Sequence, residues 1–223
     1  MGYLPLFLNV EGVPCLVVGG GRTALRKAAM LLEAGARVDM VSPQFDAAFA
    51  ELKSRFEETL VLRQEPYASS DLSMYPLVFA ATSQHTVNHT VAEDARRGGI
   101  WVNVVDKPEL CSAICGAELR RGPLQIAVST GGACPTLAVA LRDELAAQYP
   151  EWTGVFASAL GSLRCWLRER CPETALRRQV LHRLASRDTR DRFRGLESEP
   201  LLSQLRDEAE ALLRGSGRAK HHG

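Results

Sequence analysis

The stretch CLVVGGGRTALRKAAMLLEAGARVDMVSP, residues 15–43, places three glycines between an apolar run and an amphipathic run, and a second apolar run follows. Gly19, Gly21 and Ala24 have the spacing G-x-G-x-x-A at the junction of a predicted strand and a predicted helix. In dinucleotide-binding folds the first glycine makes the tight turn, the second admits a pyrophosphate, and the third small residue lets helix and strand pack closely. The helix N-terminus adds free N–H groups for phosphates. The stretch therefore predicts nucleotide binding, with a ligand-free tight turn as the alternative.

Outward from this stretch, short apolar runs alternate with amphipathic helical runs up to about residue 106. Strands are predicted at residues 13–18, 37–41, 60–64, 77–81 and 101–104, and helices at residues 22–34, 45–56 and 86–97. Such alternation requires right-handed crossovers and gives a parallel sheet covered on both faces. The sequence therefore predicts an α/β, Rossmann-like domain over residues 1–111.

The pattern changes at residue 112. Two extended runs around the turn RRGP predict a hairpin, and a helix follows from Pro135, since proline suits the first helical turn. After Pro150 the chain is helical and rich in arginine, with breaks near residues 171–172 and 195. We expect a small α+β region over residues 112–150 and a C-terminal helical domain over residues 151–223, ending in the frayed tail GRAKHHG.

Composition excludes several classes of protein. The 223 residues carry a formal net charge of +1, so no overall field favours a nucleic acid or membrane partner. No apolar run approaches the roughly 20 residues that cross a bilayer, and the N-terminus lacks the pattern of a secretory signal. The six cysteines are scattered, which is typical of reduced thiols in a cytoplasmic protein.

The second predicted strand lacks the terminal acid that normally holds the adenosine ribose, because residues 41–44 read VSPQ. Asp39 lies in mid-strand, where the alternation of side chains can turn it away from the crevice. Ser42 and backbone groups are the alternative ribose contacts. The stretch leaves NAD or NADP open, and the absence of a basic residue at the strand end favours NAD. The predicted cofactor-binding residues are Gly19, Gly21, Arg22, Thr23, Ser42, Pro43, Gln44, Ala81, Thr82, Asn103 and Val104.

Two further stretches end at the same edge of the predicted sheet, where ligands of open parallel sheets bind. LVFAATSQHTVN brings Ala81 and Thr82 beside the cofactor, and IWVNVVDKPEL brings Asn103, Val104 and Asp106. Asp106 is a carboxylate at the mouth of the crevice, where a proton acceptor or a metal ligand would stand. A turn or helix cap is the alternative role for such an acid.

Four segments together resemble a known family: LPLFLNVEGVPCLVVGGGRTALRKAAMLLEAGARV, AATSQHTVN, NVVD and IAVSTGGACPTLA. Their order and spacing are similar to those of the precorrin-2 dehydrogenase family, the dehydrogenase and ferrochelatase module of siroheme synthase. The similarity runs from about residue 4 to residue 145. The resemblance implies a Rossmann-like NAD domain, a central dimerisation region and a helical C-terminal domain in a homodimer. It also implies NAD-dependent oxidation of precorrin-2 to sirohydrochlorin and, in some members, insertion of ferrous iron to give siroheme.

The resemblance also assigns roles to residues. The family's essential acid in NVVD is here Asp106, which would take a proton during oxidation and, in chelation, accept pyrrole protons or briefly hold Fe²⁺ or Co²⁺. Thr130 matches a hydroxyl residue that some members present to the active site. Together with Gly131, Gly132 and Thr136 it is a candidate contact for the carboxylates of precorrin-2. Ordinary helix capping is the alternative role for the two threonines.

The chain departs from the family after NVVD, where members commonly carry Phe-x-x-Pro and this chain reads CSAICGAEL. The lost bulk affects how a macrocycle would pack and whether chelation occurs. Cys111 and Cys115 are four residues apart, and small buried apolar residues are the alternative to a metal or redox role. Ten arginines stand against four acids between residues 163 and 195, as substrate contacts or as a solvated helix face.

Two other classes of function stay open at this level. One is a nucleotide-sensing regulatory domain, which would leave the hairpin, the STGG loop and the helical tail without a role. The other is a metal-handling or assembly protein that binds a cofactor without redox turnover.

Overall fold

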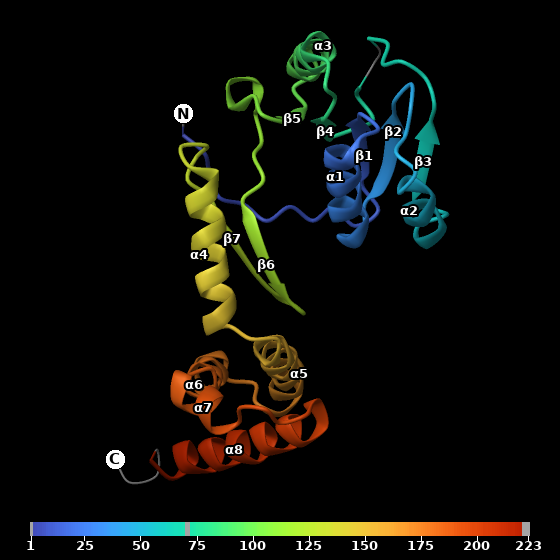
Figure 1. Cartoon of the computed structure of the whole chain (residues 1–223). Helices are drawn as coiled ribbons and strands as arrows, with labels where there is room; N and C mark the ends of the chain where they lie inside the picture. Colours follow the sequence, from blue (N-terminus) through green and yellow to red (C-terminus); the bar gives the residue numbers. More distant parts are fainter. Residues whose placement is uncertain (1, 70–71, 220–223) are drawn as a thin grey trace. The chain divides into compact units, whose positions relative to one another are not determined.

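The computed structural model describes residues 2–69 and 72–219. The chain divides into two compact units, Met1–Cys115 and Gly116–Gly223 (Figure 1). The first unit holds the parallel sheet, and the second holds a hairpin and five helices among the described residues. The predicted division into three domains at residues 111 and 150 stays a prediction.

The first unit is built on five parallel strands in the order β3-β2-β1-β4-β5. Their bounds are β1 (Pro14–Val18), β2 (Arg37–Val41), β3 (Leu60–Arg63), β4 (Leu77–Ala80) and β5 (Trp101–Val104). Since β2 and β4 lie on opposite sides of β1, the order reverses there and opens a crevice at the carboxyl ends of these strands. The predicted Rossmann-like α/β fold is confirmed.

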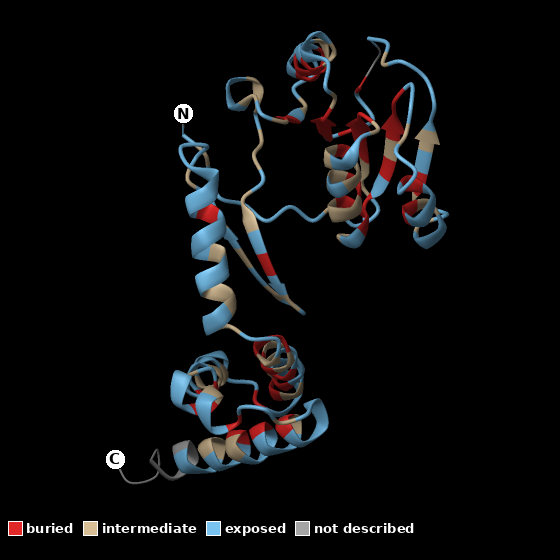
Figure 2. Cartoon of the chain, in the orientation of Figure 1, coloured by how far each residue is buried: buried red, intermediate tan, exposed pale blue. Residues whose placement is uncertain are grey.

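Helices cover the sheet on two faces, and each face has its own apolar core. The helices are α1 (Arg22–Glu33), α2 (Phe49–Arg55) and α3 (His85–Arg97), followed by the short 3₁₀ helix η1 (Pro108–Leu110). Cys15 and Val17 pack in the cluster that includes α1, whereas Leu16 and Val18 pack in the cluster that includes α3. Alternate side chains of β1 thus point to opposite faces, and both are buried, which explains the unbroken apolar run CLVV (Figure 2).

One helix begins later than its pattern predicts. The apolar periodicity predicts a helix from residue 45, but α2 starts at Phe49. The carboxylate of Asp46 accepts a hydrogen bond from the N–H of Ala48 at 2.9 Å, and the N–H of Asp46 donates to the carbonyl of Gly20 at 2.8 Å. These bonds hold residues 45–48 as a turn against the glycine loop.

The second unit begins with an antiparallel hairpin of β6 (Ala117–Arg121) and β7 (Leu124–Val128), on which α4 (Pro135–Gln148) packs. The hairpin is predicted from residue 112 but starts at 117. The N–H groups of Ser112 and Ala113 donate to the carbonyl of Val102, and the Ser112 hydroxyl accepts from the N–H of Val102. These bonds tie the connecting segment to β5, so it does not extend the hairpin.

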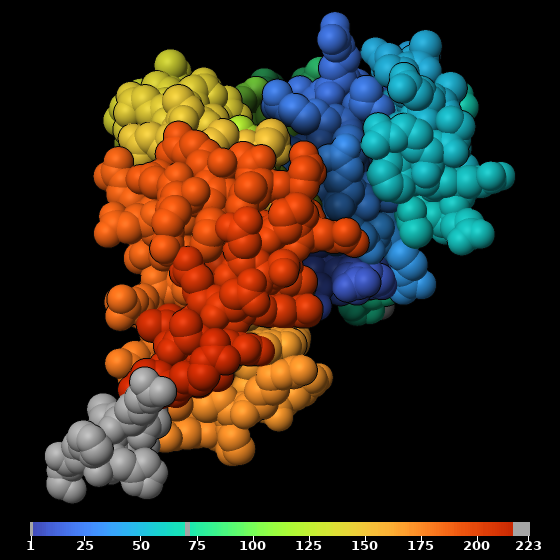
Figure 3. Space-filling view, turned by 90° about the horizontal axis from the view of Figure 1, so that it is seen from below, coloured from blue at the N-terminus to red at the C-terminus, as the bar shows by residue number. Residues whose placement is uncertain are grey.

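Four helices complete the second unit: α5 (Trp152–Arg170), α6 (Thr174–Leu184), α7 (Arg187–Arg192) and α8 (Ser198–Ala219). They are coloured orange to red in Figures 1 and 3. Their buried faces meet in one apolar cluster that includes Phe156, Leu163, Leu167, Val180, Leu184, Leu201 and Leu205. The breaks predicted near residues 171–172 and 195 fall between helices. Of the predicted frayed end, residues 217–219 belong to α8, and residues 220–223 lie outside the described part.

Among the helices of residues 2–69 and 72–219, none is both long enough and apolar enough to cross a membrane.

Candidate functional site

The turn between β1 and α1 consists of three glycines with different surroundings. Gly19 has a φ of +132°, and a Cβ atom there would collide with the carbonyl of Ala81. A Cβ atom at Gly20 would collide with the carbonyl of Gln44, whereas one at Gly21 would meet nothing within 4 Å. Without a side chain, Gly19 allows close approach of the backbone that follows β4, and Gly20 allows close approach of the backbone that follows β2. Gly21 leaves its own backbone exposed to a ligand.

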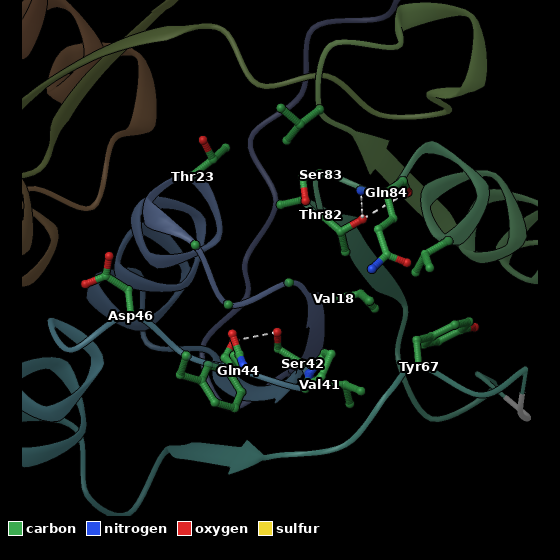
Figure 4. A pocket seen from close by; sticks show the side chains of 18 of the residues that line it. Val18, Thr23, Val41, Ser42, Gln44, Asp46, Tyr67, Thr82, Ser83 and Gln84 are labelled. Carbon is green, nitrogen blue, oxygen red and sulfur yellow. Dashed lines mark hydrogen bonds between the residues drawn. The ribbon is translucent and has the colours of Figure 1, made fainter.

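This turn borders a cavity of about 1060 Å³ at the carboxyl ends of the strands (Figure 4). The helix α1 starts there with Gly21 as its N-cap and no acidic residue in its first turn. Its free N–H groups and partial positive charge therefore suit a phosphate. The sequence-predicted residues that line the cavity are Gly19, Gly21, Arg22, Thr23, Ser42, Pro43, Gln44, Ala81, Thr82 and Asp106.

Asn103 and Val104 do not border the cavity, although both were expected to contact the cofactor. Both are buried in β5. The Asn103 amide donates to the carbonyl of Ala113 at 3.0 Å, and the N–H of Val104 donates to Cys111 Sγ at 3.1 Å. Both residues hold the segment after η1 against the sheet, and their contact with a cofactor stays a prediction.

The Cys111 thiol is tied to the backbone in the same way. Its Sγ donates to the carbonyls of Val104 and Lys107, and burial raises its pKa. These contacts fit the packing role for Cys111, while Cys115 is exposed.

The chain after β2 supplies the second wall of the cavity. Ser42 is buried, and its hydroxyl donates to the carbonyl of Gln44 at 2.7 Å, so it shapes the loop that faces Gly20. Asp39 accepts from the hydroxyl of Tyr75 and does not line the cavity. Asp46 does line it and brings a carboxylate to the edge where an adenosine ribose binds in this fold. The sequence signal for Asp46 is an acid two residues after VSPQ, which lies beyond the strand end where the ribose-binding acid is expected.

The loop after β4 forms the third wall and is fixed by one buried amide. Asn88 accepts from the N–H and from the hydroxyl of Thr82, at 3.2 and 2.8 Å, and its own amide donates to the Thr82 carbonyl at 3.0 Å. The Thr82 hydroxyl also bonds the main chain of Gln84 (Figure 4). Asn88 thereby positions the small residues of AATSQHTVN, a role that the sequence did not predict.

Tyr67 closes the fourth side, at the start of the long connection between β3 and β4. Its hydroxyl and that of Ser69 each donate to Asp94 of α3 at 2.8 Å, and Arg97 pairs with the same buried carboxylate. Burial acts to raise the pKa of Asp94, but these three partners outweigh it and lower the pKa below the usual value. Burial and the bond to Asp94 raise the pKa of Tyr67. The connection is therefore anchored to α3 by a charged hydrogen-bond network.

Asp106 lies just beyond β5 and lines the same cavity as the glycine turn. Its φ of +59° is a conformation that few residues other than glycine adopt, although aspartate tolerates it better than most. Asp106 is exposed, and within the described residues its carboxylate has no hydrogen bond or ion pair. The carboxylate is thus available to a substrate. Over residues 2–69 and 72–219, no three His, Cys, Asp or Glu side chains cluster as metal ligands, so its transient metal role stays a prediction.

The STGG loop, residues 129–132, belongs to the second compact unit. The Thr130 hydroxyl accepts from the N–H of Cys134 at 2.9 Å, and Gly131 and Gly132 have φ of +64° and +88°. Thr136 is exposed in the first turn of α4. Thr130 therefore holds the turn that precedes α4, whose N-cap residue Cys134 makes no side-chain cap bond, and Gly131 and Gly132 are exposed. The contacts of these residues with a substrate stay a prediction.

Comparison with known proteins agrees with this geometry. A family model described as "Putative NAD(P)-binding" matches residues 6–117, and one described as "Sirohaem biosynthesis protein central" matches residues 121–148. The fold and the glycine cavity define a Rossmann-like NAD(P)-binding protein.

Relatives and a solved structure narrow the class. The chain is 42% identical over 183 residues to a siroheme synthase of Methylococcus capsulatus, covering 82% of this chain and 38% of the relative. It is 40% identical over 213 residues to a siroheme synthase of Azotobacter vinelandii, covering 96% of this chain and 44% of the relative. The chain thus spans about two fifths of the length of these relatives.

The solved structure titled "SirC, precorrin-2 dehydrogenase" has the same fold, with a TM-score of 0.74 and 22% identity, covering 94% of this chain and all of that one. The chain belongs to the siroheme synthase family, as its four motifs indicated, and it matches part of the length of these relatives.

Proposed function

We propose that this chain catalyses the NAD-dependent oxidation of precorrin-2 to sirohydrochlorin. The observation that carries the proposal is that the bare surface of Gly21 and the free carboxylate of Asp106 border one cavity. The names of the siroheme synthase relatives and of the precorrin-2 dehydrogenase with the same fold support the choice of substrate.

The residues around the glycine turn fit a dinucleotide. Gly21 and the N-terminus of α1 would hold the pyrophosphate, with Arg22 and Thr23 beside it. The Asp46 carboxylate would accept hydrogen bonds from the hydroxyls of the adenosine ribose. Its negative charge would repel the 2′-phosphate of NADP, which favours NAD. The bound nicotinamide supplies the hydride acceptor.

Asp106 would act as the general base. Oxidation removes one hydride and one proton from the reduced macrocycle, and the Asp106 carboxylate accepts that proton. Asp106 lines the cavity, and no described residue forms a hydrogen bond or an ion pair with its carboxylate oxygens, which leaves them accessible to a substrate. The candidate contacts to the substrate carboxylates remain Thr130, Gly131, Gly132 and Thr136, because N–H groups of a glycine-rich loop bind anions.

We further propose that the chain works as a homodimer in the cytoplasm. On α4 only Ala138 is buried, while Leu137, Val139 and Leu141 are 49%, 43% and 37% exposed. A hairpin covered by one helix buries little apolar surface, so we propose that a second copy of the chain covers these exposed apolar side chains. None of the six cysteines is in a disulfide, which agrees with a reducing compartment.

The test is anaerobic incubation of the protein with precorrin-2 and NAD, following the absorbance of NADH. We expect one NADH for each sirohydrochlorin formed. Addition of Fe²⁺ or Co²⁺ after oxidation, with the chlorin spectrum as readout, then tests metal insertion. If NAD binds but no NADH forms, the protein is a nucleotide-binding or metal-handling domain instead.

A further inference from the structure

A second cavity, of about 690 Å³, lies in the C-terminal unit between α5 and α6. Four arginines line it, Arg164 and Arg168 from α5 and Arg177 and Arg178 from α6. Thr174 and His182 of α6 also line it. Among the described residues, no acidic side chain lines it. We call this cavity the arginine groove.

The arginines of the groove are not paired with acids, unlike many others in the same unit. Within the described residues, no carboxylate lies within 4 Å of Arg164, Arg168 or Arg178. Elsewhere in the unit Arg192 bonds Glu208 at 2.9 Å, and Arg194 bonds Asp191 at 2.7 Å. A solvated helix face of mixed charge therefore does not describe the groove.

Arg177 is the preorganised member of the set. Its guanidinium donates to the carbonyls of Cys171 and Pro172 at 2.6 and 2.7 Å and to the hydroxyl of Thr174 at 2.9 Å. These bonds hold the side chain across the turn between α5 and α6. Its charge is thus fixed at the edge of the groove, and no carboxylate of residues 2–69 or 72–219 forms an ion pair with it.

Concentrating like charges in this way costs stability. Arg164 and Arg168 are four residues apart on α5, and cations at this spacing repel each other. Arg177 and Arg178 of α6 add two more guanidinium groups to the same groove, and a bound anion would relieve the repulsion among them. Leu181 also lines the groove and adds a small apolar surface.

We propose that the arginine groove is a binding site for a small molecule that carries two or more closely spaced oxyanions, as phosphates or carboxylates. Guanidinium groups bind both kinds of oxyanion through paired N–H donors. A volume of about 690 Å³ lies within the usual range for small-molecule sites. Its lining shares no residue with the nucleotide cavity, and the proposal does not depend on the proposed oxidation.

Titration calorimetry of the full chain with inorganic pyrophosphate tests the proposal, at constant ionic strength and with NAD present to occupy the nucleotide cavity. A parallel titration uses uroporphyrin, an octacarboxylate. We expect binding that weakens about tenfold or more in the double variant Arg164→Gln/Arg178→Gln. The anion whose affinity falls identifies phosphate or carboxylate as the preferred group.

The control is Arg206→Gln on α8, which removes an exposed arginine outside the groove. It should change the affinity by less than about twofold. Circular dichroism of each variant checks the fold. Hydrogen exchange of the peptides covering residues 164–185 should slow on addition of the anion in the unaltered chain and in the Arg206→Gln control, and should slow less in the groove variant at the same anion concentration. Equal weakening in the control and the groove variant, or no saturable binding of either anion, would overturn the proposal.

Discussion

At the scale of single residues, Gly20 and Gly21 are neighbours with opposite requirements. Gly20 has no side chain because the carbonyl of Gln44 occupies the space, whereas Gly21 has none although its surroundings are open. The first constraint comes from the fold itself. No neighbouring atom imposes the second constraint, and close approach of a bound pyrophosphate explains it.

This difference predicts separate outcomes for two similar changes. Gly20→Ala should lower the free energy of unfolding by about 1–3 kcal/mol or more, because a methyl group collides with backbone. Gly21→Ala should leave stability within about 1 kcal/mol and weaken NAD binding about tenfold or more. Urea denaturation and fluorescence titration with NAD measure the two effects. Unchanged NAD affinity in Gly21→Ala would contradict the assigned role.

The buried Asp94 carries a pH-dependent share of stability. Because its pKa in the folded protein is lowered, its contribution is present above the unfolded value of about 3.9 and is lost as pH falls through the folded pKa. Asp94→Asn should therefore destabilise the protein by about 1.5–3 kcal/mol at pH 7, and this difference should shrink below about pH 4. Denaturation curves across pH measure it, with exposed Glu57→Gln as the control. A difference that stays constant with pH would count against the charged network.

At the scale of elements, the sequence predicted which helices and strands form in the first unit, but it did not predict where α2 and the hairpin begin. The five strands and three helices of the first unit follow from the alternation of apolar runs. The starts of α2 and of the hairpin do not, because side chains and backbone groups distant in sequence, such as Asp46 with Gly20 and Ser112 with Val102, fix them. The same reason explains why Asn88 and Tyr67 were missed: their partners are set by the tertiary fold.

The helix α4 carries the prediction about assembly. Leu137→Glu/Leu141→Glu should shift the protein from dimer to monomer, since two charges are placed on the exposed apolar face. Sedimentation velocity measures the oligomeric state. Ser203→Glu/Gln204→Glu, which adds two charges at exposed positions of α8, should leave the dimer intact. A dimer that survives the α4 change, with its fold intact by circular dichroism, would place the interface elsewhere.

At the scale of the whole molecule, the chain joins a nucleotide-binding unit to a unit with its own basic groove. The sequence predicted the first from a local motif, and ten of the expected site residues do line its cavity. The sequence shows that the second unit is rich in arginine. It does not show which arginines line the groove and which form ion pairs with acids, because that depends on how α5 and α6 pack.

In the proposed reaction, Asp106 removes a proton while a nicotinamide in the same cavity takes a hydride. The rate of anaerobic NADH formation from precorrin-2 in Asp106→Asn tests this role, since asparagine keeps the shape and tolerates the positive φ at this position. We expect a rate at least about 100-fold lower, with the affinity for NAD and the unfolding curve unchanged. A variant that oxidises precorrin-2 at the rate of the unaltered chain would contradict it.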